Sequence, residues 1–71
     1  MSETVTIRVN GESETVAVAT VAALLEEKEI GADARGVAVA LNGAVVPRAA
    51  WRETRLSSGD AVEIVRARQG G

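Results

Sequence analysis

The sequence predicts an α+β fold, with one helix packed on one face of a mixed sheet of four to five strands. Apolar residues alternate near both ends of the chain, and one segment between them has apolar residues at helical spacing. Two Asn-Gly pairs add the signal of tight hairpin turns. At 71 residues the chain makes one domain, close to the lower limit for a core without disulfides or metals.

The first predicted element is a β-hairpin. Residues 4–9 alternate, Asn10-Gly11 suits both central positions of a type I′ turn, and residues 12–18 alternate again. The side chains that this pattern directs inward are Val5, Ile7, Val9, Val16 and Val18. We expect Ile7 and Val9 to pair with the opposing valines, which leaves Glu12 and Glu14 in water.

A single helix is predicted after this hairpin. Thr20 can cap it by offering its hydroxyl to an unpaired backbone N–H. The spacing i, i+3, i+4 and i+7 is then occupied by Val21, Leu24, Leu25 and Lys28. We expect Lys28 to lay its stem along this face and keep its ammonium in water. Gly31 is expected to end the helix in the left-handed conformation.

Residues 37–41 predict a third strand, in which larger apolar side chains alternate with alanines. Asn42-Gly43 then turns the chain into a short Val45-Val46 segment. Pro47 closes this segment because proline cannot donate to a sheet ladder.

Residues 48–56 are expected to be irregular or briefly helical, anchored by Trp51 and Leu56. Trp51 is the only aromatic residue, so a place in or at the edge of the core is favoured over an interface role. A turn over residues 57–60 leads into a last strand over residues 61–67.

This order of elements suits a β-grasp, or ubiquitin-like, fold. The first and last strands should lie side by side and parallel at the centre, because a helical crossover makes parallel neighbours possible. We assign residues 1–67 to the domain and residues 68–71 to a flexible C-terminal tail, which contains no apolar side chain.

The composition excludes several classes of function. The sequence contains no Cys and no His, which removes thiol nucleophiles, imidazole bases and the usual zinc ligands, and no pair of carboxylates suggests acid–base catalysis. We therefore predict no catalytic residue, no metal site and no permanently bound cofactor. The net charge of -2 argues against nucleic acid as a partner. No apolar run approaches the roughly 20 residues that span a bilayer, so we expect protein partners. We expect a cytoplasmic location because Met1-Ser2-Glu3 is followed at once by a strand pattern, and not by the charged and apolar regions of a signal peptide.

The end of the chain carries the candidate chemistry. Gly70 and Gly71 have no Cβ, so they can enter a channel too narrow for other residues, with Gln69 behind them. Four residues from Arg68 onward reach roughly 13 Å, enough to enter an active site while the domain docks outside it. Arg66 and Arg68 lead into this tail and are candidates for partner docking, with ordinary solvated charge as the alternative.

The carboxylate of Gly71 is the predicted working group. An ionised carboxylate is a poor acyl donor because its charge repels nucleophiles and oxide is a bad leaving group. Formation of an acyl-adenylate from ATP would give a mixed anhydride that sulfur can attack, leaving a thiocarboxylate. A frayed and inert end is the alternative reading of the two glycines alone.

Several segments together resemble the ThiS family, the β-grasp sulfur carriers of thiamine biosynthesis. They are Val9-Asn10-Gly11, residues 35–43, Val45-Val46-Pro47-Arg48, Trp51, residues 59–67 and Gln69-Gly70-Gly71. The sequence departs from this pattern in Arg68, where a smaller or apolar residue is expected, and in having no Phe in its core. The first departure bears on docking and the second on packing, and neither touches the terminal glycines.

The resemblance implies a cycle with three protein partners. A ThiF-type adenylating enzyme would use ATP to activate Gly71, a cysteine desulfurase or related donor would supply sulfur, and thiazole synthase would consume the thiocarboxylate. The chain would be a co-substrate and not an enzyme. The alternatives are a carrier for another pathway, such as the MoaD type for molybdopterin, a ubiquitin-like modifier of lysines, or an interaction module with an inert tail.

Overall fold

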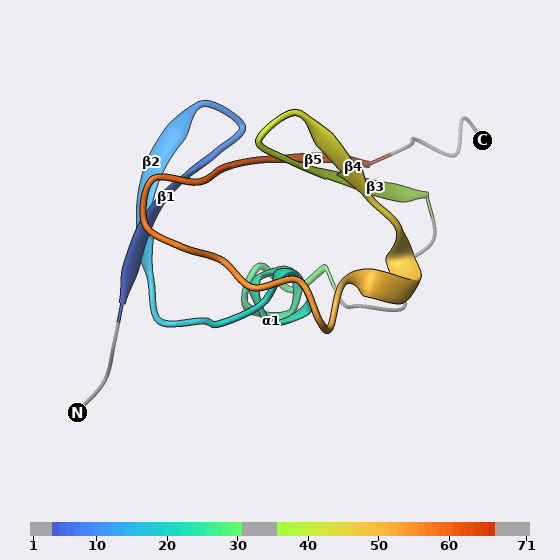
Figure 1. Cartoon of the computed structure of the whole chain (residues 1–71), viewed down its shortest axis with the longest axis horizontal. Coiled ribbons are helices and arrows are strands. Elements are labelled where there is room, and N and C mark those ends of the chain that lie inside the picture. Colours follow the sequence, from blue (N-terminus) through green and yellow to red (C-terminus); the bar gives the residue numbers. More distant parts are fainter. Residues whose placement is uncertain (1–3, 31–35, 67–71) are drawn as a thin grey trace.

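In a computed structural model of the chain, residues 4–30 and 36–66 are described, and they form five strands, one α-helix and one 3₁₀ turn (Figure 1). In chain order these are β1 (Val5–Val9), β2 (Glu12–Val16), α1 (Val21–Glu27), β3 (Val37–Leu41), β4 (Ala44–Val46), η1 (Arg48–Ala50) and β5 (Ala61–Arg66). The expected brief helix is η1, and Val45-Val46 belongs to a full strand. Residue 67, the expected end of the last strand and of the domain, lies outside the described residues.

The strands form one mixed sheet in the order β2-β1-β5-β3-β4. The central strands β1 and β5 run parallel, with Arg8 opposite Ala61 and Val9 opposite Val62. The other neighbours are antiparallel. Figure 1 shows α1 on one side of the sheet, and no helix of residues 4–30 and 36–66 covers the other face. The arrangement is the predicted β-grasp, with its parallel pair at the centre.

Both Asn-Gly pairs form the predicted turns. Asn10 and Asn42 each have φ near 52°, and the glycines that follow have φ of 87° and 88°. All four residues therefore have the positive φ that a type I′ turn requires. Positive φ is uncommon for side chains other than glycine, and asparagine tolerates it well.

The expected pairing of the first hairpin is wrong. Val5 lies opposite Val16, but Ile7 lies opposite Glu14 and Val9 opposite Glu12. A two-residue turn after Val9 fixes this register, because it makes Val9 and Glu12 the first opposing pair. Val18, expected in the strand, lies beyond it and packs half-buried against the core.

The sequence did not reveal the ion pair that Lys28 makes. Glu14 shares the helix-facing side of the sheet with Ile7, and its two carboxylate oxygens lie 2.8 and 2.9 Å from Lys28 Nζ. Both side chains are half-buried, at 31% and 28% exposure. The ammonium therefore pairs with a carboxylate at the margin of the core, whereas Glu12 is exposed as expected.

The helix begins as predicted and ends earlier. Thr20 Oγ1 accepts a hydrogen bond from the Ala23 N–H at 3.2 Å. At the other end Glu29, with φ of 63°, has the left-handed conformation expected of Gly31. The N–H groups of Glu29 and Ile30 then donate to the carbonyls of Glu26 and Leu25, at 3.0 and 2.9 Å, which is a Schellman motif. Gly31 itself lies outside the described residues.

The core lies between α1 and the sheet. Its largest member, Trp51, is 2% exposed, and its indole Nε1 donates to the Val46 carbonyl at 2.9 Å. The Trp51 carbonyl accepts from the Ala22 N–H, and the Thr54 carbonyl accepts from the Val21 N–H, both at 3.0 Å. The segment after η1 thus closes the core and satisfies the start of the helix, and Leu56 is buried beside it. Both predicted anchors are confirmed.

Candidate functional site

The predicted tail, residues 68–71, begins two residues after the end of β5, a central strand of the sheet. Arg66 is the last residue of β5, lies opposite Val37 of β3, and is exposed. Arg68, Gln69, Gly70 and Gly71 lie outside the described residues, so their predicted roles stay predictions. Since β5 has β1 on one side and β3 on the other, the tail is attached to a strand inside the sheet and not to an edge strand.

Asn10 holds β5 from the β1 side. Its backbone N–H donates to the Val62 carbonyl at 2.9 Å. Its side chain reaches further along β5, where Oδ1 accepts from the Ile64 N–H at 2.8 Å and Nδ2 donates to the Ile64 carbonyl at 3.2 Å. The primary amide thereby makes both hydrogen bonds that a backbone peptide group of a neighbouring strand would make.

Asn42 holds the beginning of the same strand from the β3 side. Its backbone N–H donates to the Ala61 carbonyl at 2.7 Å, and its Oδ1 accepts from the Ala61 N–H at 2.9 Å. Its Nδ2 donates to Asp60 Oδ1 at 3.0 Å, while Asp60 Oδ2 accepts from the Ser57 N–H at 2.8 Å. These hydrogen bonds join the β3–β4 hairpin to the turn that precedes β5.

Sequence reasoning assigned the two asparagines to their turns and missed these contacts. Asn10 and Ile64 are 54 positions apart, so no local pattern connects them. The available signal was the choice of Asn in both turns, since Asn carries a donor and an acceptor that Asp and Gly do not combine.

The helix-free face of the sheet carries an exposed apolar surface. Val45 is 78% exposed and Val65 is 62% exposed. Ala40 lies opposite Val45, and Ala38 lies opposite Val65, so the four side chains share one face. We call Ala38, Ala40, Val45 and Val65 the outer patch. Val65 is next to Arg66, which places the patch at the base of the tail and makes it a suitable surface for a protein partner.

A shallow groove lies on the other side of the tail base. Its polar lining comes from Asn10, Glu12, Glu14, Lys28 and Arg66, and its apolar lining from Val9, Ile30 and Ile64. Charges of both signs line it, and the Glu14–Lys28 ion pair is part of its wall. The groove therefore favours polar contacts, in contrast to the outer patch.

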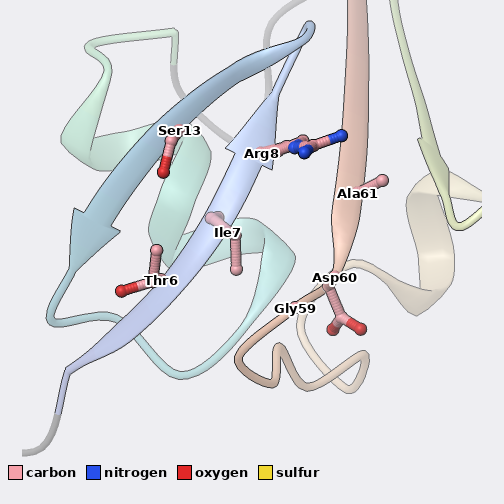
Figure 2. A pocket seen from close by; sticks show the side chains of 7 residues that line it. All are labelled: Thr6, Ile7, Arg8, Ser13, Gly59, Asp60 and Ala61. Carbon is pink, nitrogen blue, oxygen red and sulfur yellow. The ribbon is translucent and has the colours of Figure 1, made fainter.

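A second groove runs beside the start of β5 (Figure 2). Arg8 extends from β1 toward β5, and Asp60 lies at the lower end of the view. Asp60 Oδ1 accepts a hydrogen bond from Asn42 and Oδ2 accepts one from Ser57, so this carboxylate stabilises the turn before β5. Within residues 4–30 and 36–66, no group of three metal-ligating side chains gathers, and no helix is long and apolar enough to cross a membrane.

Known proteins place the chain in a family. The model of the ThiS family matches residues 5–71. A crystal structure of the thiamine biosynthesis protein ThiS from Geobacter metallireducens is 39% identical, with a TM-score of 0.75, and the match covers 93% of this chain and 99% of that one. A solution NMR structure of a thiamine biosynthesis protein from the same organism is 38% identical with the same TM-score, and covers 93% of this chain and 87% of that one. No curated protein matches the chain. The chain belongs to the ThiS family.

Proposed function

We propose that this protein is a sulfur carrier, which delivers sulfur as a thiocarboxylate on Gly71 for formation of the thiazole ring of thiamine. The observation that carries the proposal is the family match, which runs to the last residue and so includes Gly70-Gly71. The structural neighbours described as thiamine biosynthesis proteins, at 38% and 39% identity, support the same pathway.

The proposed chemistry begins with activation by a partner enzyme. A carboxylate oxygen of Gly71 attacks the α-phosphorus of ATP, pyrophosphate leaves, and an acyl-adenylate forms. Sulfur at the oxidation level of sulfide then attacks the acyl carbon, and AMP leaves with the original oxygen. The net change on the carrier is the exchange of one oxygen for one sulfur, and a thiocarboxylate is the better nucleophile for the next step.

The proposed partners follow from these steps. A ThiF-type adenylating enzyme uses ATP on Gly71, and a sulfur donor such as a cysteine desulfurase supplies the sulfur as a persulfide, which a thiol reductant brings to the level of sulfide. Thiazole synthase then consumes the thiocarboxylate. The chain is then a protein co-substrate and not an enzyme. The outer patch offers an apolar contact surface beside the tail base, and Arg66 offers positive charge on the opposite face of the sheet, in the groove that it lines with Lys28 and Ile64. Arg68 is the second candidate for docking through its charge. A cytoplasmic location is part of the proposal, because the activation step consumes ATP.

Reconstitution with purified partners tests the proposal. The full chain is incubated with a ThiF-type enzyme, ATP and a sulfide source, and its intact mass is measured. We expect the mass of an oxygen-to-sulfur exchange, and no such change in a matched variant that lacks Gly71. The modified chain is then given to thiazole synthase and, separately, to molybdopterin synthase. Sulfur transfer to the second enzyme alone would contradict the thiazole assignment, and conjugates on lysines would indicate a protein modifier.

A further inference from the structure

The end of β5 extends beyond its neighbour β1. Backbone pairing between these two strands is given by Arg8 opposite Ala61 and Val9 opposite Val62. Asn10 then leaves the strand for the turn, after donating its N–H to the Val62 carbonyl. Beyond Val62 the edge of β5 that faces β1 therefore needs another source of hydrogen bonds, because an unpaired peptide group at a sheet edge frays readily.

The Asn10 amide supplies these bonds at one position. It makes two hydrogen bonds to Ile64, at 2.8 and 3.2 Å, and they are partly buried. On the opposite edge, β3 continues to pair up to Val37 opposite Arg66. The peptide groups of Ile64 are thus held by Asn10, two residues before the strand ends at Arg66.

We infer that Asn10 is a positioning residue for the C-terminal carboxylate, through its two hydrogen bonds to Ile64. The inference rests on the proposed function, in which Gly71 must enter the site of an adenylating enzyme. These two hydrogen bonds, which we call the Asn10 clamp, fix the direction in which β5 ends. They also keep the last residues of the strand ordered before a partner binds.

The physical reason is conformational entropy. When the tail enters a partner's site, every residue that is not yet ordered loses backbone freedom and weakens binding. The hydrogen bonds at Ile64 order the end of the strand in advance, so that residues 64–66 have little backbone freedom left to lose when a partner binds. If one residue of the strand is no longer ordered before binding, the entropy cost of ordering it weakens binding roughly tenfold. This cost should appear as a rise in KM of about tenfold with kcat unchanged.

The two hairpins provide a matched pair of variants. Asn10→Gly and Asn42→Gly both keep a residue that accepts positive φ at the first turn position, and both remove side-chain bonds to β5. Asn42 contacts Ala61 and Asp60, at the opposite end of β5 from the tail. A purely structural role predicts that both variants lose stability and react alike.

The measurements are KM and kcat for adenylation by a ThiF-type enzyme, the melting temperature, and hydrogen exchange of the Ile64 amide. We expect Asn10→Gly to raise KM about tenfold and to speed exchange at Ile64, and Asn42→Gly to change neither. Asn10→Asp is the second variant, to be used if Asn10→Gly does not fold. It keeps an acceptor for the Ile64 N–H and loses the donor, so it should raise KM by a smaller factor.

The outcomes separate this inference from the function on which it rests. Equal KM values for the unmodified chain and the folded Asn10 variant contradict the inference alone. A rise of the same size in Asn42→Gly contradicts it too, because it would show a general effect of stability. If the unmodified chain is not adenylated at all, the proposed function fails and the inference fails with it.

Discussion

At the scale of single residues, a few side chains fix local geometry. Glu29 ends the helix in a left-handed conformation, with φ of 63°, that costs an L-residue free energy. Trp51 fills the core, and its indole N–H donates a hydrogen bond to the Val46 carbonyl. Arg48 lies over the Trp51 ring, with its guanidinium carbon 5.7 Å from the ring centroid. Glu29 and Trp51 each lead to a prediction about stability.

Replacing Glu29 with glycine should stabilise the domain. Glycine adopts positive φ without a Cβ penalty, and the Schellman hydrogen bonds of Glu29 and Ile30 use only backbone atoms. We expect the free energy of unfolding in urea to rise by about 0.5–1 kcal/mol. Glu27→Gly is the matched control, because Glu27 is the last residue inside α1 and glycine should cost up to about 1 kcal/mol there. A fall in stability for Glu29→Gly would contradict the assigned cap.

Replacing Trp51 with alanine should be severe. The ring is 2% exposed, so its removal leaves a cavity and an unpaired Val46 carbonyl. We expect a loss of about 3–5 kcal/mol, a large share of the roughly 4–10 kcal/mol available to a domain of this size. This loss of stability is measured by unfolding the variant in urea and monitoring the transition by circular dichroism. Val45→Ala is the control, since Val45 is 78% exposed and should change stability by no more than about 0.5 kcal/mol. Equal effects of the two variants would refute the core role.

At the scale of elements, the sequence predicted the kinds of element better than the contacts between them. Both hairpins and the helix follow from local patterns, namely the Asn-Gly pairs and the spacing of Val21, Leu24 and Leu25. The expected register matches apolar side chains across the hairpin, whereas the two-residue turn decides the register and places Ile7 opposite Glu14. The Glu14–Lys28 pair joins a strand to a helix, which no local pattern reveals.

Charge reversal at the base of the tail should weaken docking without unfolding the domain. Arg66 is exposed at the end of β5, next to Val65 in the chain but on the opposite face of the sheet from the outer patch. We expect Arg66→Glu, alone or together with Arg68→Glu, to raise the KM for adenylation while stability changes by no more than about 0.5 kcal/mol. Arg52→Glu, an exposed charge reversal in the segment after η1, is the control. Unchanged adenylation of the Arg66 variant would refute a docking role and leave it as solvated charge.

At the scale of the whole molecule, the predicted fold and the proposed chemistry rest on different features of the sequence. The element order and a short chain restrict the topology to a helix on a mixed sheet, and the parallel pairing of β1 with β5 follows from the crossover. The proposed working group can be named without a structure, because it belongs to the terminal Gly70-Gly71 of the sequence. The hydrogen bonds by which Asn10 holds β5 could not be predicted, because Asn10 and Ile64 meet only in the folded chain.

Domain and tail together define how a carrier of this kind would work. The folded part presents an exposed apolar patch and a strand clamped by Asn10, and the chain then continues to two glycines. Neither Cys nor His occurs in the sequence, so the proposed chemistry depends on partner enzymes. The central claim is therefore about the covalent state of one carboxylate.

The most direct test is the intact mass of the protein recovered from cells that make the proposed partners, with a free and untagged C-terminus. We predict a population whose mass differs from the sequence by one oxygen-to-sulfur exchange, with fragmentation that places the sulfur on Gly71. Recovery of only the unmodified carboxylate, from cells whose adenylating enzyme is shown to be active, would contradict the sulfur-carrier function.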